Sequence, residues 1–197
     1  LIFNFPYSGG GRLDLDLNFH YAKRCVAIPG DTFYIDNGFY RVKQVADTLG
    51  YINNQRILSQ RSDHDFLPEI FHCFPHNHRF NWNIKSFGPV YIPERGVTMQ
   101  IDTLNILLYR NLIAYETEKQ VAVKNGAVML GDSAIGEYTF GKNYYFMAGD
   151  YVFDSQDSRY WGLLPEDHIT GKVAFVWNTK DRNTGKKRWN RFLKKIE

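Results

Sequence analysis

Lys23 is the first residue whose position suggests chemistry, because it lies, beside Arg24, in a strand-like run from Tyr21 to Ile28 that is otherwise apolar. Burial lowers the pKa of a lysine amine, and only the neutral amine can take a proton from another group. A neutral lysine beside a serine hydroxyl would give the Ser–Lys form of nucleophilic catalysis. A single lysine in a strand is more often an edge residue whose amine reaches water, so this reading needs a second motif.

The second motif is a long and compositionally unusual segment, 149–162, which reads Gly-Asp-Tyr-Val-Phe-Asp-Ser-Gln-Asp-Ser-Arg-Tyr-Trp-Gly. This segment resembles a signature box of bacterial type I signal peptidases, and so does the lysine run through Ile28-Pro29-Gly30-Asp31. The continuation over 163–173 and the opening Phe3-Asn4-Phe5-Pro6 add to the resemblance. Type I signal peptidases are membrane-anchored serine proteases that use a serine and a lysine. Residues 144–150 and 188–192 are similar to relatives from Bacteroides-like bacteria. The resemblance is dense over 1–42 and 121–192 and thin between.

The resemblance assigns roles to four residues of the two motifs. It implies that Lys23 is the general base and that Ser155 hydrogen-bonds and orients its amine. It further implies that Asp157 and Arg159 form an ion pair that supports the second motif. Judged without the resemblance, Asp157 and Arg159 would be an ordinary surface ion pair of little energetic value.

The family also implies a substrate and a location. Tyr21 and Ala22 would line a channel in which the small residues of a signal peptide bind as an added strand. The activity would be that of an endopeptidase, a hydrolase of protein secretion that removes signal peptides after small residues such as Ala-x-Ala. We expect no cofactor and no metal. The catalytic part would face the periplasm at the bacterial inner membrane, which the parent protein would reach through an N-terminal membrane segment.

Two departures from the family bear on activity. Tyr151-Val152 stands where the family usually has Asn-Arg, and no Ser-Met-x-Pro-like serine box precedes Lys23. Ser8, in a glycine-rich turn, is a poor substitute for that serine. Because the chain begins at Leu1 without a methionine, we expect it to be truncated before the serine box and inactive as given. The alternative is a non-catalytic relative of signal peptidases that binds or scaffolds peptides.

The expected fold is mainly β, with an antiparallel catalytic core formed by residues 1–35 and 143–179. An inserted, β-rich region with one helix would occupy 36–142, and a basic tail 180–197. Self-cleaving repressors share the Ser–Lys logic and a related core, but they lack this long insertion and the second motif. We expect Gly149 and Gly162 to be turn positions that require glycine conformations.

Local signals predict several individual elements. Asn37-Gly38 and Asn125-Gly126, flanked by apolar residues, predict two β-hairpins. Residues 173–177 predict a buried strand. Apolar spacing from Ile101 to Tyr115 predicts a helix whose first turn is served by Asp102 or Thr103.

The sequence offers a possible zinc site and a possible disulfide, but the evidence for each is weak. Residues 71–78 hold one cysteine and three histidines, yet Pro75 breaks any helical face and no second ligand pair follows at zinc-finger spacing. We therefore expect loop histidines without zinc. Cys25 and Cys73 do not make a disulfide framework; Cys25 suits a small buried apolar role, and whether the two pair stays open.

Composition and charge limit the remaining classes. The chain has 197 residues, 44% hydrophobic and 16% aromatic, which is ample for a packed core, and its net charge is +3. No apolar run approaches the roughly 20 residues of a membrane span. Residues 180–197 hold eight Lys or Arg against two acidic residues, with Trp189, Phe192 and Ile196 on one face of a predicted short helix. Such a tail suits an anionic membrane surface, or a solvated terminus docked on the body, better than nucleic acid.

Overall fold

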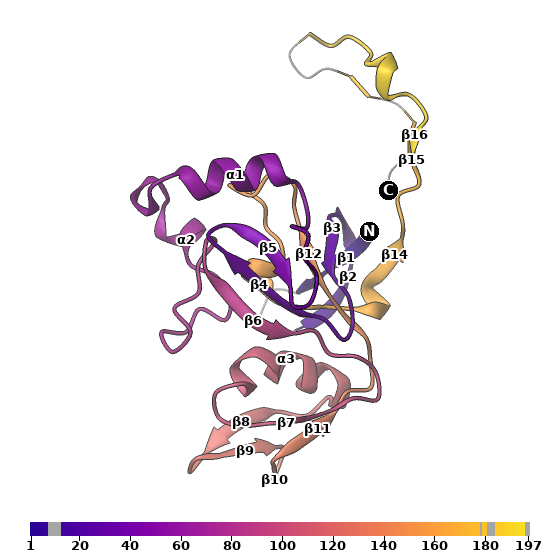
Figure 1. Cartoon of the computed structure of the whole chain (residues 1–197). Coiled ribbons are helices and arrows are strands. Elements are labelled where there is room, and N and C mark those ends of the chain that lie inside the picture. Colours follow the sequence, from indigo (N-terminus) through magenta and orange to yellow (C-terminus); the bar gives the residue numbers. More distant parts are fainter. Residues whose placement is uncertain (8–12, 178, 181–183, 196–197) are drawn as a thin grey trace.

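The computed structural model describes residues 1–7, 13–177, 179–180 and 184–195. Its described strands all pair antiparallel, in several small sheets, so the predicted mainly β fold is confirmed (Figure 1). No helix within these ranges is long and apolar enough to cross a membrane.

Two sheets bring the ends of the chain together. In the first, β1 lies between β2 and β14, and in the second, β12 lies between β3 and β13. Lys23 directly precedes β3 and the second motif directly follows β12, so the antiparallel pairing of these strands brings the two motifs together although they are far apart in the chain. The strands are β1 (Ile2–Tyr7), β2 (Leu13–Ala22), β3 (Arg24–Ala27), β12 (Tyr144–Ala148), β13 (Leu164–Pro165) and β14 (Ile169–Gly171).

A third sheet, β5-β4-β6, packs on this core. It comprises β4 (Thr32–Asp36), β5 (Phe39–Val42) and β6 (Phe87–Tyr91). The first hairpin prediction is confirmed, since Asn37 and Gly38 have φ of +47° and +84° and join β4 to β5. The ring of Phe33 stacks on that of Phe146 with centroids 4.1 Å apart, which fastens this sheet to β12.

Short helices follow β5 and cover one side of the sheet. They are α1 (Ile52–Gln60), a 3₁₀ turn η1 (Asp63–Asp65) and α2 (Pro68–Phe71). Gln55 of α1 is fully buried; its side chain accepts a hydrogen bond from Tyr40 N and donates one to Leu49 O. This pair of bonds holds α1 against β5, because a buried amide must satisfy its polar atoms within the protein.

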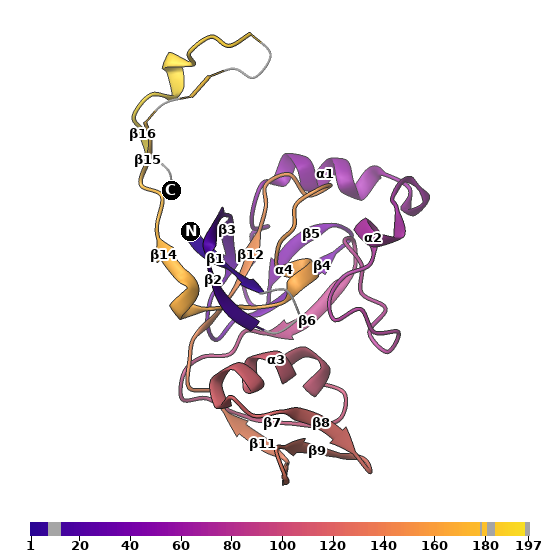
Figure 2. The same cartoon turned by 180° about the vertical axis from the view of Figure 1, so that it is seen from behind.

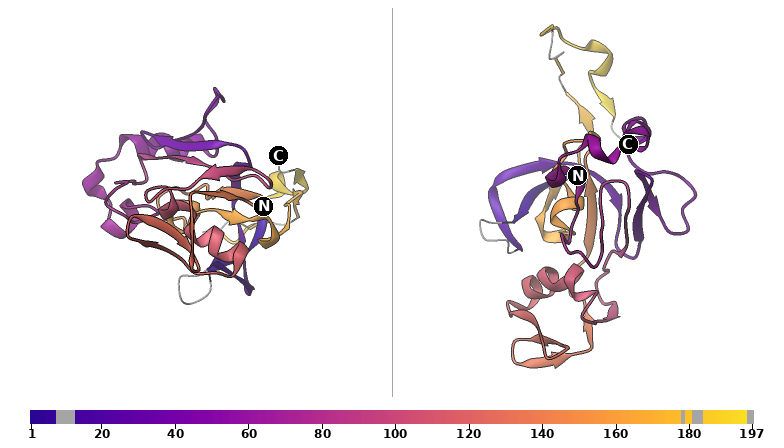
Figure 3. Two further views of the ribbon diagram at one scale, coloured as in Figure 1. Left: turned by 90° about the horizontal axis from the view of Figure 1, so that it is seen from below. Right: turned by 90° about the vertical axis from the view of Figure 1, so that its left-hand side faces the viewer.

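The middle of the chain forms a lobe at the opposite end of the molecule from the C-terminal segment (Figures 2 and 3). Its elements are β7 (Thr98–Gln100), α3 (Ile106–Thr117), β8 (Val121–Lys124), β9 (Ala127–Leu130), β10 (Ser133–Ile135) and β11 (Glu137–Thr139). The second hairpin prediction is confirmed, with Asn125-Gly126 joining β8 to β9. Glu116 accepts hydrogen bonds from Tyr138, Tyr144 and two backbone amides, and so ties the lobe to β12.

The predicted helix exists, but its predicted start is wrong. α3 begins at Ile106 rather than near Asp102. The Asp102 carboxylate instead accepts hydrogen bonds from the backbone amides of Leu104 and Asn105 in a turn before the helix. Leu104 is consequently exposed, although the helical spacing placed it with the buried residues.

Two predictions for the C-terminal part are wrong. The strand over 173–177 is reduced to β15 (Phe175–Val176), and Phe175 and Trp177 are 50% and 67% exposed rather than buried. The tail forms a single 3₁₀ turn, η3 (Trp189–Arg191), and then β16 (Lys194–Lys195), which pairs with β15. Strand pairing has replaced the expected amphipathic helix; Ile196, part of that expectation, lies outside the described residues.

The two cysteines are both free thiols. Cys73 is buried, and Cys25 is half-buried with its Sγ 3.4 Å from Ala27 O. Among the described residues, no group of three or more His, Cys, Asp or Glu side chains is placed to hold a metal ion.

Candidate active site

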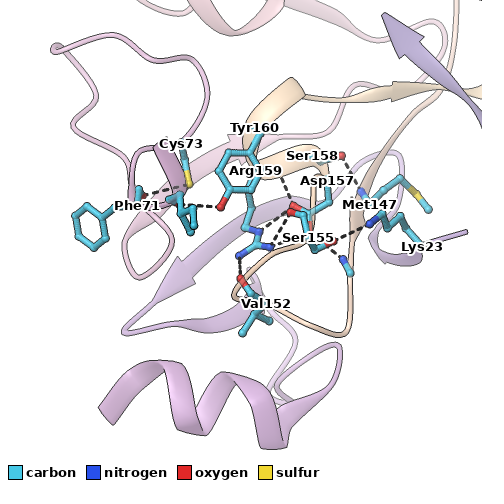
Figure 4. Close-up of polar contacts among 12 residues, drawn as sticks. Lys23, Phe71, Cys73, Met147, Val152, Ser155, Asp157, Ser158, Arg159 and Tyr160 are labelled. Carbon is cyan, nitrogen blue, oxygen red and sulfur yellow. Dashed lines mark hydrogen bonds and ion pairs between the residues drawn. The ribbon is translucent and has the colours of Figure 1, made fainter. Parts of the chain in front are cut away.

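Lys23 lies between β2 and β3, and its side chain meets the second motif. Its Nζ donates a hydrogen bond of 2.8 Å to Ser155 Oγ (Figure 4). Its backbone is held by reciprocal bonds with Leu1, with Lys23 N to Leu1 O at 3.1 Å and the Leu1 amine to Lys23 O at 2.7 Å. Backbone pairing with Leu1 therefore helps to position Lys23, so that its amine reaches Ser155, which is 132 positions away in the sequence.

The surroundings of Lys23 favour its neutral form. Burial lowers the pKa of the amine, since desolvation penalises the charged state. The Asp157 carboxylate acts against this effect and the Arg159 guanidinium acts with it, and the pKa remains below the ordinary lysine value. A lysine with a lowered pKa and a hydrogen-bonded hydroxyl neighbour can serve as a base closer to neutral pH.

The ion pair of Asp157 and Arg159 is fully buried, with both side chains at 0% exposure. Arg159 Nε and Nη2 donate to the two Asp157 carboxylate oxygens at 2.8 and 2.9 Å. The remaining groups of the pair are also used: Asp157 accepts from Gly149 N at 2.9 Å, and Arg159 Nη1 donates to Val152 O at 2.9 Å. It is therefore not a surface pair, and its burial is tolerable because nearly every polar atom has a partner.

This network determines the shape of the loop that carries Ser155. Arg159 Nη2 reaches Ser155 O at 3.4 Å, and Ser158 Oγ accepts from Met147 N of β12 at 2.9 Å. α4 (Ser158–Trp161) begins directly after Asp157, whose side chain caps it through Arg159 N. A 3₁₀ turn, η2 (Glu166–His168), follows β13. Both ends of the loop are thus fastened to β12, and Ser155 is held towards Lys23.

Position 149 requires glycine because a side chain would not fit, and not because of its backbone angles. The expectation of a turn position with a glycine conformation is therefore wrong for Gly149. A Cβ here would overlap Ser155 Oγ, lie 2.5 Å from Ser155 Cβ and lie 3.5 Å from Lys23 Nζ. Its φ is not in the left-handed region, whereas Gly162 has φ of +90° as a turn position requires. Gly149 is therefore what allows the strand end to pass beside the Lys23–Ser155 hydrogen bond.

Two further contacts at this loop were not foreseen from the sequence. Arg24 forms an exposed ion pair with Asp150 through Nε and Nη2 at 2.9 and 3.0 Å. Asn54 of α1 donates to Asp150 O at 2.7 Å. Arg24 was identifiable as the neighbour of Lys23, but nothing in the helical segment distinguishes Asn54 from Asn53 beside it.

A surface hollow of about 1160 Å³ opens beside the amine of Lys23. Ala22 and Lys23 line it together with Leu49 and Gly50, which lie between β5 and α1. Tyr21 does not line it; its ring packs on Phe5 with centroids 5.1 Å apart, within a small apolar cluster. The structure therefore brings Ala22 but not Tyr21 to the hollow.

Comparison with known families decides the assignment. The family model described as signal peptidase, peptidase S26, matches residues 2–178. The chain belongs to this family. Both motifs, and the hydrogen bond between them, lie within the matched part of this signal peptidase family member.

Relatives named signal peptidase I support the same assignment. One from Buchnera aphidicola subsp. Acyrthosiphon pisum is 28% identical over 172 residues, covering 85% of this chain and 52% of the relative. One from Buchnera aphidicola subsp. Baizongia pistaciae is 28% identical over 165 residues, covering 80% and 50%. One from Aquifex aeolicus is 48% identical over 41 residues, covering 21% and 16%. This signal peptidase family chain thus spans about half the length of the longer-matching relatives.

Proposed function

We propose that the full-length protein is a type I signal peptidase, which removes N-terminal signal peptides from exported preproteins after small residues. The observation that carries this proposal is the 2.8 Å hydrogen bond between Lys23 Nζ and Ser155 Oγ. Family membership supports it, and so does the lowered pKa of Lys23. A lysine with a lowered pKa, hydrogen-bonded to a serine, would be unneeded in a domain that only binds peptides.

In the proposed mechanism, the neutral amine of Lys23 takes the proton of a nucleophilic serine. That serine belongs to a segment of the full-length protein outside this chain. Its oxygen attacks the scissile carbonyl carbon, and the protonated Lys23 then gives its proton to the leaving amine of the mature protein. Water, activated by Lys23 in turn, hydrolyses the acyl-enzyme and releases the signal peptide.

The other residues of the site act by position. Ser155 accepts the Lys23 hydrogen bond and so directs the amine. Asp157 and Arg159 hold the loop that presents Ser155, and Ala22 offers its strand to the residues before the scissile bond. Val152, which with Tyr151 stands where the family usually has Asn-Arg, supplies the backbone carbonyl that accepts from Arg159 and buries its side chain in the core, so this exchange is compatible with the arrangement.

We further infer a location at the bacterial inner membrane, with this chain on the periplasmic side. The C-terminal segment supports contact with lipid. Trp177, Trp189 and Phe192 form an exposed aromatic cluster, with ring centroids 5.7 Å (Trp177–Phe192) and 6.0 Å (Trp189–Phe192) apart. Lys187 and Arg188 lie beside it. Aromatic rings flanked by bases suit the headgroup region of an anionic membrane.

Cleavage of a preprotein by the full-length protein tests the proposal. Detergent-solubilised protein should release a mature chain whose new N-terminus, read by mass spectrometry, follows an Ala-x-Ala sequence. Intact preprotein after prolonged incubation would instead favour the non-catalytic, peptide-binding alternative. In that case a labelled signal peptide should still bind without being cut.

A further inference from the structure

The hollow beside Lys23 has a strongly basic wall. Four bases outside the two motifs line it: Lys172, Arg191, Lys194 and Lys195. Lys172 directly follows β14, Arg191 is the last residue of η3, and Lys194 and Lys195 form β16. β16 pairs with β15, and Figure 1 shows both strands beyond β14. All four are exposed residues.

No described carboxylate neutralises this wall. Asp150 is the one acidic residue among those that line the hollow, and its carboxylate is already paired with Arg24. None of the four bases forms an ion pair with an acidic side chain in the described part of the chain. Bases gathered on one side of a hollow produce a positive potential that attracts negatively charged groups.

The chemistry of a preprotein indicates which part of it can match these bases. A signal peptide has a basic beginning, an apolar middle and small residues at its cleavage site, so it has no acidic groups to offer. The scissile bond must lie at Lys23, and Ala22 serves the residues before it under the proposed function. Acidic groups in the hollow must then come from the mature segment after the cleavage site.

A bilayer fits these four bases less well than a peptide does. The aromatic cluster suited to lipid lines a separate hollow, with Lys187 and Arg188 as its bases. A bilayer surface is planar and meets protruding residues, whereas an extended peptide can enter a hollow. The two sets of bases in the C-terminal segment therefore face different surroundings.

We propose that Lys172, Arg191, Lys194 and Lys195 bind acidic side chains in the preprotein segment that directly follows the cleavage site. This inference rests on the proposed function and adds a specificity to it. Acidic mature N-termini are preferred, chiefly through a lower KM, because the contacts are with the bound substrate and not with the reacting atoms.

The test uses the full-length protein in detergent without anionic lipid. Two preproteins differ only at the second to fifth positions after the cleavage site, which are Asp and Glu in one and Asn and Gln in the other. Wild type should show roughly 3- to 10-fold higher kcat/KM for the acidic substrate, as expected for a few exposed charge contacts, and the difference should shrink with salt. The double variant Lys194→Gln/Lys195→Gln should lose most of the preference.

A matched control keeps the result interpretable. Lys180→Gln/Lys186→Gln removes the same charge from the C-terminal part of the chain, but neither residue lines this hollow or the one beside the aromatic cluster. It should retain the preference. Equal kcat/KM for the two substrates in wild type would overturn the proposal, as would equal loss of preference in both double variants. A preference that appears only with anionic vesicles would assign the bases to lipid instead.

A binding measurement separates this inference from the proposed function. Fluorescence anisotropy of labelled peptides that match the two mature segments needs no cleavage. Tighter binding of the acidic peptide to wild type than to Lys194→Gln/Lys195→Gln would support the basic wall even if no preprotein were cut. Equal binding of the acidic and neutral peptides would contradict it.

Discussion

Gly149 leaves the space that Ser155 occupies. A Cβ on Gly149 would overlap Ser155 Oγ and reach within 3.5 Å of Lys23 Nζ, so the hydrogen bond between these two side chains depends on a missing methyl group. Even an alanine at Gly149 should therefore displace Ser155 and disturb its hydrogen bond to Lys23, although Lys23 itself is unchanged.

Gly149→Ala should lower kcat more than 10-fold and destabilise the fold by about 1–3 kcal/mol, as overpacking does. Gly136→Ala is the matched control, because a Cβ there meets nothing within 4 Å and its φ is not in the left-handed region. Preprotein cleavage and urea unfolding of both variants measure the two effects. Wild-type turnover in Gly149→Ala would show that the Lys23–Ser155 geometry is unimportant.

Breaking the buried ion pair should be costly whichever partner is removed. Asp157→Ala leaves the Arg159 guanidinium buried without its carboxylate, and should reduce the free energy of unfolding by about 3–5 kcal/mol. Removing the exposed carboxylate of Asp150 by Asp150→Ala should reduce it by under about 1 kcal/mol. Equal losses in the two variants, measured by denaturant unfolding, would contradict the assignment of Asp157 as a buried support.

Asn54 should be a positioning residue of the site, acting through the backbone of the second motif. Its hydrogen bond to Asp150 O joins α1 to the loop that carries Ser155. Asn54→Ala should lower kcat several-fold with little change in KM. Asn53→Ala, one residue earlier, removes only a 3.5 Å contact with Tyr51 and should leave kcat unchanged. The same kcat in both variants would remove Asn54 from the account.

The lowered pKa of Lys23 gives the pH dependence a sign. The base must be neutral, so kcat/KM should rise as pH rises and level off above the pKa of the amine, which is below that of an ordinary lysine. The folded state disfavours the charged amine, so the contribution of this group to stability should increase with pH between the lowered pKa of the folded state and the ordinary lysine pKa of the unfolded state. A rate profile that levels off only above the ordinary lysine pKa would contradict the role of burial.

The sequence was sufficient for the parts of the structure that local rules govern. Asn37-Gly38 and Asn125-Gly126 predicted their hairpins, because these residues adopt positive φ readily. The predicted start of α3 was wrong because the Asp102 side chain satisfies a turn instead of the helix. The tail was wrong for a long-range reason, since pairing of β15 with β16 is not encoded in helical spacing.

In the candidate site, too, some residues were predictable from local motifs and others depend on the fold. Lys23, Ser155, Asp157 and Arg159 were identified from two motifs, although the complete burial of the ion pair was not. Asn54 and the basic wall were missed because they depend on which segments the fold brings beside the motifs. Gly149 was identified for the wrong reason, since close packing against a distant serine has no local signature.

The replacement Lys23→Arg in the full-length protein tests the central claim most directly. Arginine keeps the positive charge and a hydrogen-bond donor for Ser155 but cannot lose its proton, so it cannot act as a base. We predict that cleavage of a preprotein falls to background while the unfolding midpoint stays near that of wild type, and that Lys124→Arg, an exposed control on β8, retains full activity. Cleavage by Lys23→Arg at the wild-type rate would contradict the Ser–Lys mechanism.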